Sequence, residues 1–270
     1  MATPTHEARL AVLIDADNAS AQHLERLLVE IAKYGTATVR RAYGDWTTTR
    51  LAKWKDEVLK HSVQPIQQFA YTTGKNSTDS ALIIDAMDLL HGGTVDGFCL
   101  VSSDSDFTRL AARIREQGLM AYGFGERKTP PPFVAACTKF VYVENLGGAE
   151  DAPMPAATRA ATATATAKSA KPAAAPKAAA TKAKPPLQSD TKLSKLLSEA
   201  VETAADDDGW AHLGSVGSNL SRLSSDFDSR TWGYPKLTDL LKAHPSYEVV
   251  SRSPGNGKPK VSVVRSKPRK

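Results

Sequence analysis

The chain contains little cysteine and no long apolar run. Cys99 and Cys137 are its only cysteines, too few and too isolated for a disulfide framework or a zinc site. No stretch approaches the roughly 18 consecutive apolar residues that span a bilayer. Met1 to Arg9 is polar and the apolar run after it is short, so we expect no signal peptide. These absences predict a soluble cytoplasmic protein without a membrane partner, with Cys99 buried in an apolar run.

Several kinds of catalytic motif are also missing. No glycine-rich loop follows the first apolar run, which disfavours dinucleotide binding and P-loop chemistry. The six histidines are scattered, without metal-ligand spacing or a Ser-His-Asp arrangement. A phosphatase of the haloacid-dehalogenase type expects Thr or Val four residues after its first aspartate, where this chain has Ala19. A small-molecule phosphatase is therefore a disfavoured alternative.

Positive charge is concentrated outside the expected folded parts. The formal net charge is +6, and residues 251–270 contain 7 Lys or Arg and no acidic residue. Residues 1–148 contain 16 Lys or Arg against 17 Asp or Glu. A basic tail and linker beside near-neutral domains predict capture of a polyanion, most simply nucleic acid, and a solubilising tail is the alternative.

The first half alternates strand-like and helix-like segments. Leu10 to Ile14 and Phe98 to Val101 are short apolar runs that predict buried strands, and residues 78–91 have helical spacing of apolar side chains. Such alternation predicts an α/β fold with a parallel sheet between helices. Pro65 restricts the strand predicted over residues 63–69 to an edge or irregular position.

The second half predicts a different organisation. Residues 148–190 are rich in Ala, Lys and Pro and read as a disordered linker. Three helical stripes and two strand-like segments then predict a small winged helix-turn-helix domain over residues 191–266, with a basic tail to 270. Its third helix is expected to carry Pro235 in the first turn. The first domain is expected over residues 1–147.

Aspartates gather at the ends of apolar runs in the first half. The carboxylates concerned are Asp15 and Asp17; Asp79, Asp85 and Asp88; and Asp104 and Asp106. In an open parallel sheet, sites form at the carboxyl ends of strands where the strand order reverses. If the strands ending near Asp15 and Asp104 are neighbours, the carboxylates converge on a divalent cation such as Mg²⁺, as phosphodiester hydrolysis requires.

Each aspartate also has a structural interpretation. Asp17 and Asp106 precede helical segments and could be N-caps. Asp79, near a helix start, is favoured there by the helix dipole. Asp85 could reach the rim of the site or face solvent. Asn18 could cap the first helix, or bind phosphate or a cation-bound water.

Three acidic segments occur in order along the first half, namely Leu13–Asn18, Lys75–Asp79 and Val101–Phe107. Together they resemble the motifs of the NYN domain, a PIN-like nuclease family that includes LabA-like bacterial proteins. The resemblance covers about residues 8–146 and implies a PIN-like sheet with Mg²⁺- or Mn²⁺-dependent cleavage of RNA. It implies that metal binding and catalysis depend on Asp15, Asp79, Asp104 and Asp106.

Residues 210–217 and 227–237 resemble the OST-HTH/LOTUS domain, a winged-helix module associated with RNA binding. Trp232 and Tyr234 could stack on bases, and the core is the favoured position for Trp232. A protein partner of this domain and a homodimer are both compatible with the sequence. The residues expected to contact substrate are Asn18, Lys75, Ser103, Lys236, Arg252, Lys258 and Lys260.

The sequence thus predicts a metal-dependent endoribonuclease with a C-terminal RNA-binding module. A non-catalytic RNA-binding adaptor is the main alternative, because both would carry the same second domain and basic tail. RNA is the expected partner in either case.

Overall fold

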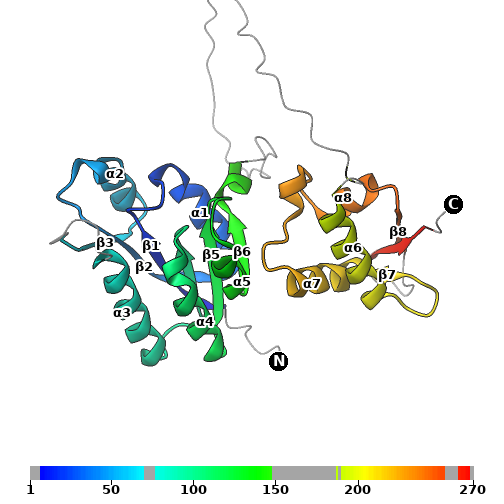
Figure 1. The fold of residues 1–270 in the computed structure, drawn as a ribbon, viewed down its shortest axis with the longest axis horizontal. Helices are drawn as coiled ribbons and strands as arrows, with labels where there is room; N and C mark the ends of the chain where they lie inside the picture. Colours follow the sequence, from blue (N-terminus) through cyan, green and yellow to red (C-terminus); the bar gives the residue numbers. More distant parts are fainter. Residues whose placement is uncertain (1–6, 70–76, 148–186, 188–189, 253–260, 268–270) are drawn as a thin grey trace, which may run out of the picture.

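A six-stranded parallel sheet forms the centre of the first half in this computed structural model, which describes residues 7–69, 77–147, 187, 190–252 and 261–267 (Figure 1). The strand order is β3-β2-β1-β4-β5-β6. The bounds are β1 Arg9–Asp15, β2 Thr36–Gly44, β3 Gln64–Gln67, β4 Gly97–Val101, β5 Met120–Gly125 and β6 Lys139–Tyr142. Every neighbouring pair is parallel. The order reverses between β1 and β4, so the carboxyl ends of these two strands flank the switch point.

Helices cover both faces of this sheet (Figure 1). On one face lie α1 (Leu24–Ile31) and α2 (Ala52–Lys60), and on the other lie α3 (Ser77–Gly92), α4 (Thr108–Glu116) and α5 (Pro131–Ala136). Short 3-10 turns are η1 Ala21–His23, η2 Thr49–Leu51, η3 Ser105–Phe107 and η4 Val143–Gly147. None of the helices among the described residues combines the length and the apolar character of a membrane span.

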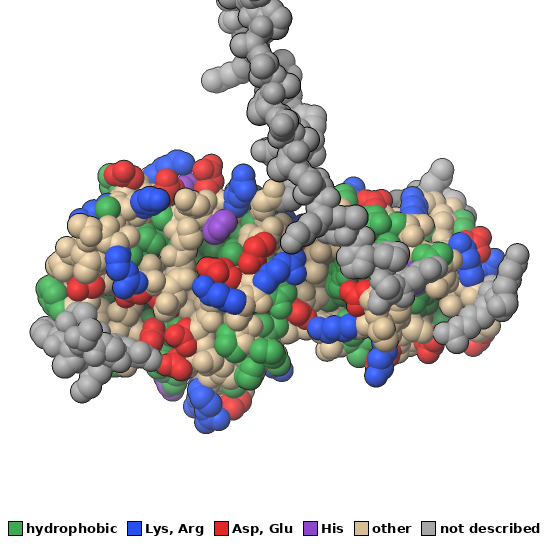
Figure 2. All heavy atoms as spheres, turned by 45° about the horizontal axis from the view of Figure 1, so that its top comes forward, with side chains coloured by type: hydrophobic (Ala, Val, Ile, Leu, Met, Phe, Trp, Pro, Cys, Tyr) green, Lys and Arg blue, Asp and Glu red, His purple; other side chains and the backbone are tan. Residues whose placement is uncertain are grey.

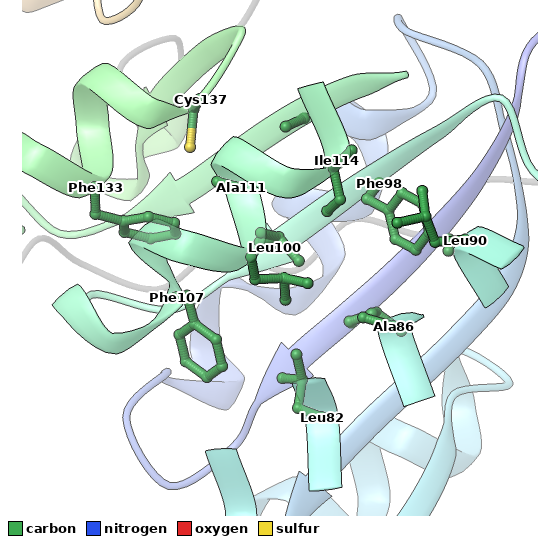
Figure 3. Close-up of a cluster of buried hydrophobic side chains, with 14 of the residues drawn as sticks. Leu82, Ala86, Leu90, Phe98, Leu100, Phe107, Ala111, Ile114, Phe133 and Cys137 are labelled. Carbon is green, nitrogen blue, oxygen red and sulfur yellow. The ribbon is translucent and has the colours of Figure 1, made fainter. Parts of the chain in front are cut away.

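The two faces of β4 show how the sheet is buried. Phe98 and Leu100 contribute to the core under α3 and α4, and Figure 3 shows Leu90 of α3 beside Phe98. Cys99 and Val101 point into the opposite core, under α1 and α2. Because side chains alternate along a strand, a strand covered on both faces reads as a continuous apolar run. The predicted burial of Cys99 is confirmed.

The strands and helices predicted for the first half are present, with one addition. The strand containing Pro65 is β3, at the edge of the sheet, as the proline required. The helix α5 was not predicted, because it begins in a run of prolines. Pro131 occupies its first turn, where a missing N–H costs no helical hydrogen bond.

The second half contains three α-helices and a small antiparallel sheet among its described residues. The helices are α6 Thr191–Ala204, α7 Leu213–Leu223 and α8 Leu237–Ala243, and the strands are β7 Ala211–His212, β8 Tyr247–Arg252 and β9 Val261–Ser266, in the order β7-β9-β8. Leu193, Leu197, Val216 and Leu240 share its core. The two strands predicted here gain β7 as a third, because Ala211 and His212 pair with β9.

The predicted start of the third helix is wrong. Lys236, with φ −135° and ψ 149°, is the extended N-cap of α8, and the helix begins at Leu237. Pro235 therefore lies before the helix rather than in its first turn. A proline disfavours helical geometry in the residue before it and leaves its own position compatible with extended backbone.

A segment of the second half packs along the edge strand β6 of the first. We call residues 224–232, which follow α7 and include the 3-10 turn η6 (Ser229–Trp232), the docking segment. The Phe140 N–H donates to the Ser225 carbonyl at 2.8 Å, and the Ser225 hydroxyl donates to the Val134 carbonyl at 2.8 Å. The first bond satisfies one backbone donor of an edge that would otherwise be open to another strand, and the second reaches α5.

An ion pair completes this junction. Arg230 of the docking segment donates to both carboxylate oxygens of Glu30 on α1, at 2.9 and 3.0 Å. Although burial acts against the charged form, the bonds from Arg230 and Lys33 lower the pKa of Glu30 to about 2. The bidentate geometry favours a defined orientation of the two halves.

Candidate metal centre

Asp15 lies at the carboxyl end of β1 and is completely buried. Its carboxylate accepts hydrogen bonds from the Ser102 hydroxyl at 2.7 Å and from Asn18 Nδ2 at 2.9 Å. Burial raises the pKa of Asp15, and the bonds from Asn18 and Ser102 partly offset this effect. The carboxyl group of Asp15 therefore has a fixed orientation beneath the switch point.

Asp104 and Asp106 lie in the loop that follows β4. Asp104 is the N-cap of η3, and its side chain accepts from the Asp106 N–H at 2.9 Å. Its own N–H donates to the Ser102 hydroxyl at 3.1 Å. Because β4 pairs with β1 in parallel, the condition set for convergence of the carboxylates is met, and both strands end at the same edge of the sheet.

Asp79 enters the same edge from the first turn of α3. Asp79, Asp104 and Asp106 each place one carboxylate oxygen in a group whose members lie within 4.8 Å of one another. Burial, followed by the charges of Asp15 and Asp104, raises the pKa of Asp79 to about 6. Three carboxylates thus crowd into one small region at an electrostatic cost.

A divalent cation fits this donor set. Mg²⁺ and Mn²⁺ prefer carboxylate oxygens, and a positive charge would offset the repulsion that raises the pKa of Asp79. Asp79 is 7% exposed, Asp104 half-buried and Asp106 exposed, so the group is open to solvent on one side. Substrate and water can reach a cation held there.

Asp15 is not within the group of three. Its carboxylate already accepts from Ser102 and Asn18, although a carboxylate has about four acceptor sites. Asn18 lies in the turn after β1, where its side chain orients Asp15. Ser20, rather than Asn18, is the N-cap residue before η1, and the contact with Asp15 leaves a phosphate or cation-bound-water role for Asn18 a prediction.

Two neighbouring polar residues were missed by sequence reasoning. Ser102 joins the two strands by donating to Asp15 and accepting from the Asp104 N–H. Glu126, after β5, donates its N–H to the hydroxyl of Ser103 at 2.8 Å. Ser102 could have been identified from the sequence, because it lies between an apolar strand and Asp104. Glu126 could not, because its position beside Ser103 depends on the pairing of β4 with β5.

The helix-cap interpretation is wrong for both aspartates to which it applied. Asp104, rather than Asp106, caps η3. Ser20 is the N-cap residue before η1, and Asp17 instead accepts from the Thr78 hydroxyl at 3.0 Å. This bond links the turn after β1 to the first turn of α3, and so holds two of the acidic segments together.

Asp85 neither reaches the rim of this site nor simply faces solvent. Both Arg41 and Tyr43 of β2 donate to its carboxylate. Burial and the Asp85 carboxylate raise the pKa of Tyr43 above its ordinary value, so the phenol stays protonated. Asp85 therefore attaches α3 to the sheet. Asp88 is exposed on the same helix and outside the acidic group.

The remaining predicted substrate contacts lie far along the chain or outside the described residues. Lys236 is exposed at the start of α8. The guanidinium of Arg252 lies 4.2 Å from the centre of the Trp210 ring, in a cation–π contact. Lys75, Lys258 and Lys260 fall in segments that are not described.

The aromatic pair of the second half contributes to its core. Trp232 packs against the core cluster, contacts Phe227 with ring centres 5.6 Å apart, and donates its indole N–H to Asp190 at 2.9 Å. Tyr234 packs against the same cluster. This agrees with the core interpretation that the sequence favoured for Trp232.

A parallel sheet flanked by helices, with carboxylates at its switch point, is a PIN-like α/β fold. The family model for the NYN domain matches residues 9–144, just over half of the chain. The chain therefore belongs to the NYN family, which lies within a nuclease superfamily. The OST-HTH/LOTUS domain model matches residues 184–259, and domains of that kind bind RNA.

Three similar solved structures come from bacteria. A protein of unknown function from Vibrio parahaemolyticus is 17% identical over 54% of this chain and 98% of its own, with a TM-score of 0.46. An uncharacterised protein from Nitrosomonas europaea is 37% identical over 39% of this chain and 94% of its own, with a TM-score of 0.28.

The third, residues 175–257 of a protein from Chromobacterium violaceum, is 32% identical over 30% of this chain and 86% of its own, with a TM-score of 0.24. No curated protein matches the chain. The family assignment therefore depends on the two domain models.

Proposed function

We propose that this protein is a metal-dependent endoribonuclease of the LabA-like kind. In this proposal the NYN domain hydrolyses RNA phosphodiester bonds and the LOTUS domain binds the same RNA. The observation that carries the proposal is the convergence of Asp79, Asp104 and Asp106 at the switch point of a nuclease-family sheet.

The acidic residues would divide the work of holding the cation. Asp79, Asp104 and Asp106 would bind Mg²⁺ or Mn²⁺ directly, and Asp15 would add a ligand or a fixed negative charge behind them. When bound, such a cation supplies Lewis acidity at the scissile phosphate and acidifies water. No side-chain nucleophile is required.

Positioning residues support this arrangement. Ser102 bonds both Asp15 and the Asp104 N–H, so the two acidic loops keep a constant separation. Asn18 holds the other side of Asp15. Polar support of this kind maintains ligand geometry before substrate arrives.

Several finer assignments belong to the same proposal. We assign the nuclease domain to residues 1–147, the linker to 148–190 and the RNA-binding module to 191–266. Ser103, Asn18, Lys75, Lys236, Arg252, Lys258 and Lys260 are the proposed contacts to RNA. The cytoplasmic location, a protein partner of the LOTUS domain and a homodimer stay predictions.

The test is cleavage of labelled single-stranded and hairpin RNA by the full chain with Mn²⁺, with Mg²⁺ or with EDTA. We expect cleavage with either cation and none with EDTA. Asp104→Asn should reduce the rate more than about 100-fold, because removing even an outer-shell partner of a metal commonly costs 10- to 100-fold. Full activity of Asp104→Asn would contradict the proposal.

A matched control lies on α3. Asp79→Asn should abolish cleavage, whereas Asp88→Asn, the same change at an exposed position of the same helix, should leave it unchanged. Retained RNA binding by the intact protein with no cleavage under any cation would instead support the non-catalytic adaptor.

A further inference from the structure

A groove of about 770 Å³ runs between the two domains. One wall is formed by the end of α4, the helix α5 and the edge strand β6, and the other by the end of α7, the docking segment and the start of α6. Four cationic side chains line it, and Asp226 is the single carboxylate among its described lining residues. The cations are Arg115, Arg127, Lys192 and Arg222.

The carboxylate in the groove is already engaged. Asp226 accepts from the hydroxyl of Tyr142 at 3.0 Å and from the hydroxyl of Ser224. Although burial opposes the charged form, these bonds and the charge of Lys192 hold the pKa of Asp226 below its ordinary value. The cationic side chains are exposed. The groove therefore presents a positive surface to solvent, unlike the mixed charges spread over the face in Figure 2.

The walls of the groove hold a defined spacing. The bonds of Ser225 to Phe140 and Val134 join the two domains at the groove, and the pairing of Arg230 with Glu30 joins them elsewhere at the junction. Asn145 also donates to the Thr231 hydroxyl at 3.0 Å. A preformed site loses little entropy when it binds a chain of phosphates.

One end of the groove, at Arg127, is linked through the preceding residue to the loop of the acidic centre. Arg127 follows β5, which pairs with β4, and the preceding residue Glu126 donates to Ser103 in the loop that carries Asp104. The Arg127 guanidinium lies 5.3 Å from the centre of the Tyr142 ring. Exposed arginine planes and aromatic rings are surfaces on which unstacked bases pack.

We propose that this interdomain groove binds a single strand of RNA along its phosphate backbone and leads it to the acidic centre. The inference deepens the proposed function, on which its choice of RNA rests. Cavities of roughly 300–1,000 Å³ hold one drug-sized ligand, so the groove has room for a few nucleotides of one strand and not for a duplex. Neither domain alone has both walls.

The test is fluorescence anisotropy of a labelled, unstructured RNA oligonucleotide titrated with the full chain in EDTA, at several salt concentrations. The groove variant is Arg115→Gln/Lys192→Gln/Arg222→Gln. The matched control is Lys55→Gln/Lys60→Gln/Arg113→Gln, which removes the same charge from exposed positions of α2 and α4 outside the groove.

We expect the groove variant to bind at least about tenfold more weakly, with a salt slope reduced by about 2, since each phosphate contact on a single strand contributes roughly 0.7. The control should stay near the wild type. The charge-preserving variant Arg115→Lys/Lys192→Arg/Arg222→Lys should retain binding, which separates charge loss from misfolding. Equal binding by the groove variant and the control would overturn the inference.

Two further measurements identify the class of ligand and distinguish the groove inference from the proposed nuclease activity. Polyglutamate is the competitor for an acidic protein partner, and displacement of RNA by polyglutamate at equal charge would also overturn the inference. Cleavage in Mn²⁺ is measured separately. If binding depends on the groove but no RNA is cleaved, only the proposed nuclease activity is contradicted. If RNA is cleaved but binding does not depend on the groove, only the groove inference is contradicted.

Discussion

Two buried carboxylates of this protein have nearly the same exposure and opposite electrostatic environments. Asp79 in the acidic centre is 7% exposed and Glu30 at the domain junction is 5% exposed. Other carboxylates surround Asp79 and raise its pKa to about 6, while Arg230 and Lys33 contact Glu30 and lower its pKa to about 2.

The difference separates the proposed metal site from a structural contact. Glu30 has cationic partners within hydrogen-bond distance, so its charge stabilises the docked arrangement. Asp79 has a charge that folding alone disfavours. Unfavourable electrostatics that a ligand would relieve are typical of sites where ligand binding provides the compensation.

The largest effect on stability is expected at the junction. Glu30→Gln removes an interaction worth about 3 kcal/mol, because the pKa of Glu30 is about 2 instead of the ordinary 4.5. Arg230 then loses its charged partner on the other domain and keeps its bonds to Asp228. The domains should separate, which small-angle X-ray scattering would detect as a larger radius of gyration. An unchanged radius would mean that the other junction bonds suffice.

Asp79→Asn should change stability in the opposite direction. Without metal it should stabilise the NYN domain by up to about 3 kcal/mol at neutral pH, because the neutral amide is free of the repulsion that raises the pKa of the carboxylate. Thermal melting in EDTA measures this gain. Addition of Mn²⁺ should raise the melting temperature of the wild type more than that of the variant. Destabilisation in EDTA would remove the contrast with Glu30.

Acid should weaken the ion pair between Glu30 and Arg230 and leave the hydrogen bonds between uncharged groups at the junction unchanged. Because the pKa of Glu30 is lowered on folding, its contribution is fully present above its ordinary pKa of about 4.5 and is lost as pH falls toward 2. Scattering measured from pH 6 downward should show the wild-type domains separating within this window. Glu30→Gln should lack that transition.

The smallest effect is expected for an exposed glutamate of the same helix. Glu25 pairs with Lys60 at 3.1 Å, with both side chains more than half exposed. Since solvent screens such pairs, Glu25→Gln should change neither the radius of gyration nor the melting temperature measurably. If Glu25→Gln lowered the melting temperature as much as Glu30→Gln, loss of the charge alone would account for both effects, and the burial of Glu30 would not matter.

Most of the fold could be predicted from local pattern. The apolar runs before Asp15 and Asp104 and the stripe over α3 correspond to elements of the structure. The helix α5 could not be predicted, because its first residues are prolines that usually end helices. The strand β7 has only two residues, and it forms because β9 supplies its hydrogen bonds.

The acidic site could be predicted in outline and not in detail. The sequence indicated seven aspartates, and the three that gather most closely are Asp79, Asp104 and Asp106. Asp85 pairs with Arg41 and Tyr43 instead, since the rotation of α3 over β2 decides which side its carboxylate faces. Ser102 gained importance only when the pairing of β1 with β4 brought its hydroxyl to Asp15.

The amino-acid sequence by itself determined the sheet, its parallel character, the second domain and the strand ends where carboxylates collect, because these follow from apolar spacing along short stretches of chain. Tertiary structure alone decided which carboxylates share a site, which are neutralised, and how the two domains meet. Arg230 and Glu30 are separated by 200 residues. Partners so far apart are chosen by packing and register, for which a linear pattern contains no signal.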